Sequence, residues 1–373
     1  MALNWQPPAG GNYDDIMYAY LKAMEGDTMA PVLVNGNPTI GVGFDLVAGG
    51  ATVQNEVLIG LGLKEEIVRA TQAQAAAFVP GSWQAIEYGY VQQLRVNMGN
   101  INALNQIMKA RANDTNPQFV ANVLNRRSSF AFANDTEVRA VYDQLLPHYE
   151  QFVFNQYPAL QNDTGYLTSR ERMVLTDLAW NGGTGLLGQK LGDAIATGNR
   201  AEAWYQIRYK SNGGSSASNG IAKRRYYESE VFGLYSLYNS GDSAASLDEA
   251  TQVYQMFTTH RPDILDYEAK YGSQVTAANS DYHLSGTSSV LSLQDELRSA
   301  ADLLMQEYGH GRTDFDPRNI QMADDTLTVL TGENDTTNTG SKDDLLIGSK
   351  AHANELYGYD GNDILIGGGF NDV

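Results

Sequence analysis

The sequence contains no cysteine, which excludes disulfide bonds and thiolate metal sites. It also has no apolar run near the roughly 18 residues that a membrane-spanning helix needs, so we expect no membrane span. The first residues, MALNWQPPAGGNYDD, lack a basic start and an apolar stretch of about 7–15 residues, and therefore show no conventional signal peptide. The five histidines form no H-E-x-x-H or H-x3-H spacing and no G-x-S-x-G elbow is present, which argues against a catalytic metal and a serine hydrolase.

Positive charge is scarce as well. Against 25 lysines and arginines stand 44 aspartates and glutamates, which gives a formal net charge of −19. Such a chain repels phosphate-rich partners, so we exclude nucleic acid and anionic membranes as ligands and expect cations instead. Apolar residues are plentiful, at 42% of the sequence, and 22 residues are tyrosine. A chain of 373 residues with this composition predicts two or three domains with sizeable cores.

Residues 325–373 carry a nine-residue pattern of glycine, aspartate and a large apolar residue, clearest in GYDGNDILI at 358–366. Four aspartates share one slot of this pattern: Asp335, Asp344, Asp363 and Asp372. Three leucines share a slot two positions later: Leu346, Leu356 and Leu365. Glycines permit turns that are closed to other residues, and aspartate and turn carbonyl oxygens are ligands that Ca²⁺ prefers. A solvated acidic tail is the plainer interpretation, but it does not explain why the leucines keep the period of the aspartates.

The pattern resembles the calcium-binding repeats of the repeats-in-toxin (RTX) family. The resemblance implies a parallel β-roll over residues 325–373, in which Gly358, Asp360 and Gly361 join the aspartates around structural Ca²⁺. Tails of this kind accompany type I export through a C-terminal signal, so the resemblance also implies a secreted protein whose tail folds when it meets Ca²⁺ outside the cell.

The rest of the chain reads as mostly helical. Apolar residues at helical spacing predict helices over 13–26, 169–183, 200–210, 222–238 and 293–309. The polar stretch NSGDSAAS predicts a boundary near residue 240. We therefore expect an α+β protein with a first domain at 1–240, a helical extension or linker at 241–324, and the tail at 325–373. The pattern of residues 246–320 predicts helices but no function.

Glu25 closes the first predicted helix, directly before Gly26. Hydrolysis of a glycosidic bond usually needs one protonated carboxylic acid and a second carboxylate. The C-terminal end of a helix disfavours negative charge, so we expect this position to raise the pKa of Glu25 and to suit it as the acid. By itself, a glutamate at a helix end is more often an ordinary surface charge.

The segment PVLVNGNPTIGVGFD, residues 31–45, predicts a β-hairpin with NGN as its turn and 38–45 as the return strand. Alternation places three apolar residues on one face: Ile40, Val42 and Phe44. It places a hydroxyl, two glycines and a carboxylate on the other: Thr39, Gly41, Gly43 and Asp45. Glycine within a strand often marks close approach of a ligand, so both glycines are candidate substrate contacts.

A straight strand would hold Thr39 and Asp45 about 20 Å apart. They can share a site only if the segment between Gly41 and Gly43 bends or bulges. In a straight strand Asp45 would be a cap or turn residue, and Asn35 or Asp27 would be the candidate second catalytic group.

A helix ending in EG, followed by a hairpin with TIGVG, resembles the phage-type lysozymes, and LAWNGGTG (178–185) and NGIAKRRYYESE (219–230) resemble their later helices. Where those enzymes carry their aspartate, this chain has Leu33 and Val34. Asp45 stands instead where the related pesticin-like muramidases carry theirs. The resemblance, over about residues 13–238, implies a mainly helical lysozyme-like domain with a small β-hairpin lobe. It implies Glu25 as general acid, Asp45 as the carboxylate that activates water, and Thr39 as the residue that orients it.

The implied protein is a monomeric secreted muramidase that cleaves β-1,4 bonds between N-acetylmuramic acid and N-acetylglucosamine in peptidoglycan, with inversion as in phage lysozymes. Arg224 and Arg225 are candidate site residues, and one of them could fold back on Glu25. Two arginines on the surface that pair with Glu228 at helical spacing are an equal alternative. Two other functions stay open. One is a glycan-binding scaffold without hydrolysis, and the other is a hydrolase of another β-1,4 amino-sugar polymer such as chitin.

Overall fold

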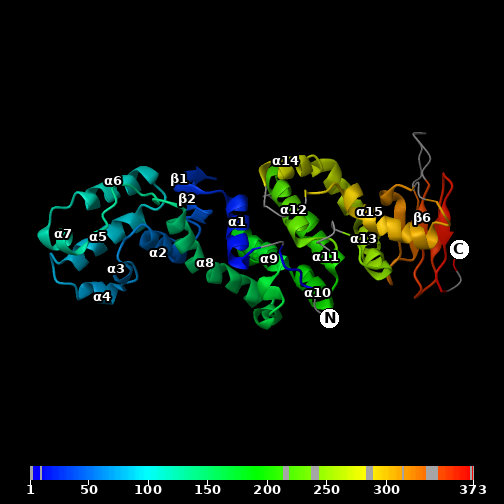
Figure 1. Ribbon diagram of the computed structural model, residues 1–373, viewed down its shortest axis with the longest axis horizontal. Coiled ribbons are helices and arrows are strands. Elements are labelled where there is room, and N and C mark those ends of the chain that lie inside the picture. Colours follow the sequence, from blue (N-terminus) through cyan, green and yellow to red (C-terminus); the bar gives the residue numbers. More distant parts are fainter. Residues whose placement is uncertain are drawn as a thin grey trace. The chain divides into compact units, whose positions relative to one another are not determined.

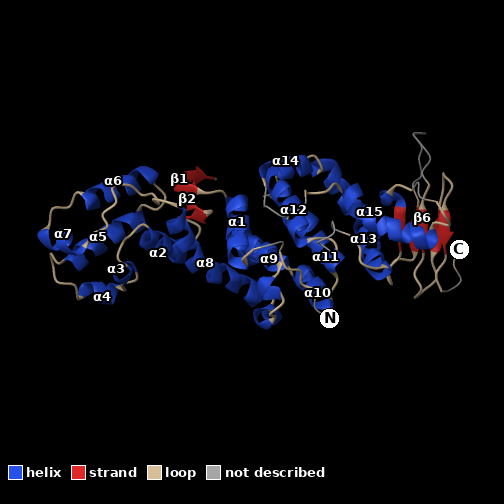
Figure 2. Ribbon diagram, viewed as in Figure 1, coloured by secondary structure: helices blue, strands red, loops and turns tan. Residues whose placement is uncertain are grey.

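The computed structural model describes residues 3–8, 11–212, 218–236, 243–282, 289–312, 315–332, 343–369 and 372. The chain divides into two compact units, Asn12–Phe152 and Met1–Gly11 together with Val153–Val373. Helices dominate the described residues, and short strands form three small sheets (Figure 1, Figure 2). The chain is therefore an α+β protein, as predicted. None of the helices in these described ranges is both long and apolar enough to cross a membrane.

The division into units falls at a place that the sequence did not indicate. The boundary lies between Phe152 and Val153 and divides the predicted first domain, 1–240, into two parts. The second half of that domain belongs to one unit with the described parts of the predicted extension, 241–324, and of the predicted tail, 325–373.

The Asn12–Phe152 unit starts with α1 (Tyr13–Glu25), which Asn12 caps by accepting a hydrogen bond from the backbone N–H of Asp14. A three-stranded antiparallel sheet follows, in the order β1 (Thr28–Val34), β2 (Asn37–Gly41) and β3 (Phe44–Asp45). The predicted NGN turn joins β1 to β2, and Asn35 and Gly36 adopt the positive φ values, 51° and 90°, that such a tight turn requires. The later helices of this unit are α2 (Gly50–Gly60), α3 (Glu65–Val68), α4 (Gln72–Ala76), α5 (Trp83–Val96), α6 (Ile101–Ala112), α7 (Pro117–Asn122) and most of α8 (Asp135–Gln156).

Polar contacts fix α1 against α8 within this unit. The hydroxyl of Tyr18 and the ammonium group of Lys22 both donate to Asp135 Oδ1 at 2.7 Å. Among the later helices, Arg111 on α6 makes two hydrogen bonds of 2.7 Å to Glu87 on α5, and neither side chain is exposed. A buried charge pair with this geometry is costly to break, since either partner alone would leave an uncompensated charge.

The other unit is built on helices α9 (Arg170–Gly182), α10 (Gln189–Thr197), α11 (Arg200–Tyr205), α12 (Asn219–Phe232), α13 (Leu247–Tyr271), α14 (Gln274–Asp281) and α15 (Leu293–Tyr308). Shorter turns of helix are η1 (Pro158–Asn162), η2 (Tyr166–Thr168), η3 (Gly183–Leu186), η6 (Pro317–Asn319) and a π-helix, η4 (Gln206–Lys210). The helices predicted over 13–26, 169–183 and 293–309 are confirmed to within one residue at each end. The helix predicted over 222–238 ends earlier, at Gly233, because this glycine turns the chain with a φ of 79°.

Five three-residue strands end the described chain: β4 (Ile320–Met322), β5 (Val329–Thr331), β6 (Leu345–Ile347), β7 (Glu355–Tyr357) and β8 (Ile364–Ile366). Successive strands alternate between two parallel sheets, so β4, β6 and β8 form one sheet and β5 and β7 form the other. Leu330, Leu346 and Leu356 meet in a buried core between them. The predicted leucine slot is thus confirmed for Leu346 and Leu356, whereas Leu365 on β8 is 46% exposed.

Candidate catalytic site

Glu25 lies at the C-terminal end of α1, half-buried, where the sequence predicted the general acid. Its carboxyl group lies over Gly43. A Cβ atom placed on Gly43 would come within 2.7 Å of Glu25 Oε2 and 2.9 Å of Glu25 Cβ. Position 43 therefore needs a glycine for Glu25 to lie as it does, and this contact joins the helix end to the hairpin.

The predicted return strand reverses its direction between Gly41 and Gly43. These glycines have φ values of 63° and 68°, which disfavour other residues, and they turn the chain so that β3 pairs with β2. Thr39 is the antiparallel partner of Asp45. Directly opposed residues in such a ladder have Cα atoms about 4.5–5.5 Å apart. The prediction of a single strand over 38–45 is thus wrong. The bend that would allow Thr39 and Asp45 to share a site is present.

The two faces of the hairpin end have the predicted character. Ile40, Val42 and Phe44 are fully buried. Thr39 and Asp45 are half-buried beside Gly43, while Gly41 is buried against the Phe44 ring, which a Cβ at Gly41 would approach to 2.6 Å. Gly41 therefore serves close packing, and Gly43 is the glycine that adjoins the candidate acid.

Asp45 has three hydrogen-bond donors. The backbone N–H groups of Val47 and Ala48 donate to Oδ1 at 2.8 and 2.7 Å, and the side-chain amide of Asn37 donates to Oδ2 at 2.9 Å. The residue therefore does close a turn, as expected of a cap, but it also lies opposite Thr39. A carboxylate has about four lone-pair positions, so these three donors leave room for one more on Oδ2.

Tyr149 on α8 is a site residue that the sequence did not indicate. Burial raises its pKa to about 12, and the negative charges of Glu25 and Asp45 contribute to the rise. Negative charges oppose the ionisation of a phenol, so Tyr149 is linked electrostatically to both carboxyl groups. Tyr149 is one of 22 tyrosines and has no distinctive spacing, which is why only the folded chain identifies it.

The two alternative catalytic groups lie in other settings. Asp27 forms an ion pair of 2.6 Å with Lys22. Asn35 is at the far turn of the hairpin, beyond the last pairing of β1 with β2, Val34 with Asn37. Neither is a strand partner of Thr39, whereas Asp45 is.

Arg224 and Arg225 lie in the other unit and are buried on α12. Both bind Glu228, with Arg224 Nε at 2.9 Å and Arg225 Nη1 at 2.5 Å from Oε1, and Arg224 also pairs with Asp177 on α9. Burial opposes the charge of Glu228, but Arg225 and Arg224 hold its pKa below the usual value. The pairing with Glu228 is confirmed, and its expected position on the surface is wrong because α12 is buried along most of its length.

The predicted calcium ligands among the described residues lie in the turns next to the C-terminal strands. Asp344 and Asp363 directly precede β6 and β8, and the backbone N–H of Asp344 donates to Asp363 Oδ1 at 3.0 Å. On the opposite side, the backbone N–H of Asn354 donates to Asp372 Oδ1 at 2.8 Å. The turns on each side of the strands are therefore joined to one another by backbone-to-aspartate hydrogen bonds. Asp335 lies outside the described residues.

Hard oxygen atoms converge at one of these turns. A Cβ placed on Gly332 would lie 2.5 Å from Asp344 Oδ2 and 2.6 Å from the carbonyl oxygen of Gly358. Asp360 and Gly361 are exposed in the turn that follows Gly358. In the described part of the chain, no three histidine, aspartate or glutamate side chains gather closely enough to hold a metal ion. A Ca²⁺ here would need carbonyl oxygens beside the carboxylates, and such oxygens fit its preference.

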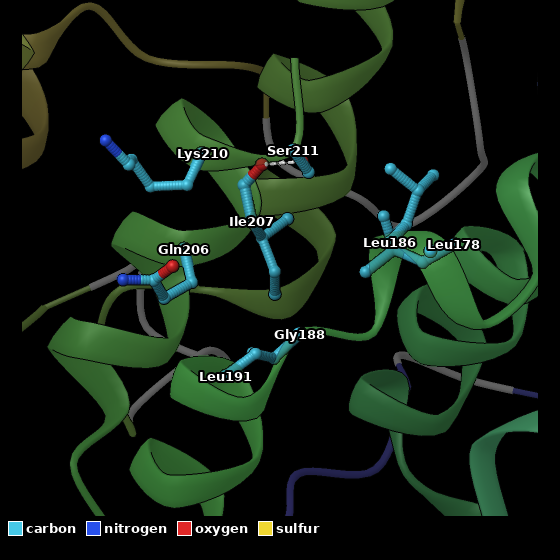
Figure 3. A pocket seen from close by; sticks show the side chains of 9 residues that line it. Leu178, Leu186, Gly188, Leu191, Gln206, Ile207, Lys210 and Ser211 are labelled. Atoms are coloured by element: carbon cyan, nitrogen blue, oxygen red, sulfur yellow. Dashed lines mark hydrogen bonds between the residues drawn. The ribbon is translucent and has the colours of Figure 1, made fainter. Parts of the chain in front are cut away.

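A separate cavity of about 250 Å³ opens among α9, η3, α10 and η4 (Figure 3). Its apolar lining includes Leu178, Leu191 and Ile207, and its polar lining includes Gln206 and Lys210. The ammonium group of Lys210 is 3.1 Å from Asp263 Oδ2. A π-helix forms one side of this cavity, and such segments are frequent at functional sites.

Comparisons with protein-family models, curated proteins and solved structures found no match to this chain.

Proposed function

We propose that this protein is a muramidase, which hydrolyses the β-1,4 bonds between N-acetylmuramic acid and N-acetylglucosamine in peptidoglycan. The observation that carries the proposal is the hairpin reversal at Gly41–Gly43, which pairs Thr39 with Asp45 and places Gly43 against the carboxyl group of Glu25. An acid, a second carboxylate and a hydroxyl thereby surround one glycine turn. Glycoside hydrolysis usually requires the first two of these groups, and the hydroxyl is available to orient water.

In the proposed reaction, Glu25 donates its proton to the glycosidic oxygen as the bond from that oxygen to the anomeric carbon breaks. A water molecule attacks the anomeric carbon and passes a proton to Asp45 Oδ2, the oxygen with a lone pair to spare. The Thr39 hydroxyl, on the neighbouring strand, orients that water. The products are two shorter glycan chains, one of them with a new reducing end on N-acetylmuramic acid.

Replacing Asp45 with asparagine is expected to lower the rate of peptidoglycan cleavage by about 100-fold, since an amide cannot accept the proton from water. Asp27→Asn and Asn35→Ala are the matched controls. Both are expected to stay within about threefold of the wild type, because Asp27 pairs with Lys22 and Asn35 lies at the far turn of the hairpin. Clearing of purified peptidoglycan and mass spectrometry of reduced fragments measure the rate and identify the new end. A large loss in Asp27→Asn with full activity in Asp45→Asn would transfer the second role to Asp27.

We further propose that the C-terminal strands form a parallel β-roll that Ca²⁺ stabilises, and that the protein is exported by a type I system. Support comes from the alternation of strands between two parallel sheets, the stacked aspartate turns and the oxygen atoms around Gly332. Ca²⁺ would be held by Asp344, Asp363 and neighbouring carbonyl oxygens. When bound, it would neutralise carboxylates that otherwise repel one another across the turns.

Adding Ca²⁺ to the full chain is expected to raise the thermal unfolding temperature of the C-terminal region, because an ion that binds only the folded state stabilises it. The gain is about 2.7 kcal/mol at a free concentration 100 times the Kd. Asp363→Asn is expected to remove most of this gain, whereas Asp302→Asn, an exposed carboxylate on α15, is expected to keep it. Circular dichroism melts with Ca²⁺, Mg²⁺ and chelator measure the effect, and identical melts in all three would refute the calcium proposal.

A further inference from the structure

Two exposed tyrosines lie together on the smaller parallel sheet. Tyr357 ends β7 with 42% of its surface exposed, and Tyr359 follows in the next turn with 55% exposed. Their ring centroids are 6.2 Å apart and their planes differ by 21°. The Tyr357 hydroxyl donates to Glu355 Oε2 at 2.9 Å, which fixes that ring in place. We call these two rings the tyrosine platform. Aromatic side chains gain much from burial, and those left in contact with water together are typical of binding surfaces.

The backbone of Tyr359 is strained. Its φ of 60° lies in the left-handed region, where a Cβ atom is disfavoured. The turns after β6 and β8 place Ser349 and Gly368 at the corresponding position, and neither has a positive φ. Strained residues other than glycine are found mostly at functional sites. This turn therefore keeps a large exposed ring at a position where glycine would fit without strain.

The surroundings of the platform define its ligand. Thr331 on β5 is the parallel partner of Tyr357, and Glu355 and Asp360 are exposed nearby in sequence. No lysine or arginine follows Lys350 in the chain. The surface thus offers nearly parallel aromatic rings and carboxylate acceptors. The nearby Arg312 guanidinium donates to the carbonyl oxygen of Asn362 at 2.5 Å and is paired with Asp343, so its charge is offset. Anionic polymers are repelled from such a surface.

We propose that the tyrosine platform binds an uncharged glycan chain of β-1,4-linked N-acetylhexosamine, through residues other than those of the candidate catalytic site. A pyranose ring presents a face of C–H groups that packs on an aromatic ring, and its hydroxyl groups donate to carboxylates such as Glu355. Quaternary ammonium groups also bind tyrosine rings, but they do so best inside a cage of rings. Two rings inclined by only 21° do not surround a cation.

Binding of the full chain to insoluble chitin, measured by co-sedimentation with Ca²⁺ present, tests this proposal. The chain carries Glu25→Gln so that the polymer persists. Tyr357→Ala and Tyr359→Gly are each expected to weaken binding about five- to tenfold, in line with the loss of one aromatic contact. Tyr357→Phe is the matched control, and it is expected to bind nearly as the parent does because the ring remains. Equal binding by all four proteins overturns the proposal.

The stability of Tyr359→Gly provides a second measurement. Because glycine relieves the left-handed strain, the C-terminal region of this variant is expected to unfold at or above the temperature of the parent while its glycan binding falls. A variant that loses both thermal stability and glycan binding would show that Tyr359 supports the fold, and would overturn a binding role. Release of the bound protein by choline chloride, but not by equal sodium chloride, would assign the platform to cations instead. Binding is measured without turnover, so failure of the proposed hydrolysis leaves this test intact.

Discussion

Replacing Glu25 with glutamine is expected to reduce the clearing of purified peptidoglycan by about 1,000-fold, within the range for loss of a general acid. Glutamine has nearly the same size and can occupy the space over Gly43, but it has no proton to give to the leaving oxygen. The fold is expected to persist, because glutamine keeps the size and the polar end of the side chain. Turbidity of the cell-wall suspension gives the rate, and circular dichroism melts establish that the variant is folded.

Glu66→Gln is the matched control for this substitution. Glu66 is an exposed glutamate on α3 in the same unit, so its replacement changes the net charge equally without reaching the hairpin. We expect this control to clear peptidoglycan at the wild-type rate. Equal activity of both variants would show that Glu25 is not the acid. A wild-type protein that binds peptidoglycan but never clears it would favour the glycan-binding scaffold.

Features that depend on neighbouring residues were predictable from the sequence. The tight turn at Asn35–Gly36 follows from an Asn-Gly pair that tolerates positive φ, and Gly26 marks the end of α1 for the same reason. The leucine period near the C-terminus likewise predicted the buried residues Leu346 and Leu356. In each case a short pattern is enough, because the geometry is set within a few residues.

Features that depend on distant contacts were not predictable in this way. The charges of Glu25 and Asp45 contribute to the raised pKa of Tyr149, and the order of residues in α8 does not record this link. Arg224 and Arg225 have the composition of a solvated helix face, yet they lie buried because Asp177 and Glu228 offset their charge. Alternating side chains predicted one return strand over 38–45 and left open whether it bends. In the structure, the positive φ values of Gly41 and Gly43 reverse the chain there.

The contact between Gly43 and Glu25 makes a second strong prediction. Gly43→Ala is expected to lower peptidoglycan clearing by about 100-fold, since a displacement of about 1 Å in a catalytic group can cost this much. The added methyl group would occupy the position now 2.7 Å from Glu25 Oε2 and would push the carboxyl group aside. The left-handed backbone at residue 43 also costs about 1–2 kcal/mol of folding stability with alanine.

Gly36→Ala separates these two effects. Gly36 has a φ of 90°, so alanine strains its backbone as well, but a Cβ there would have no atom within 4 Å. We therefore expect similar losses of stability in urea for both variants and a large loss of activity for Gly43→Ala alone. In the Glu25→Gln background, Gly43→Ala is expected to cause little further loss, because the group it displaces no longer donates a proton. Additive losses would mean that Gly43 acts on the substrate directly, as a strand glycine open to a ligand would, and not by positioning Glu25.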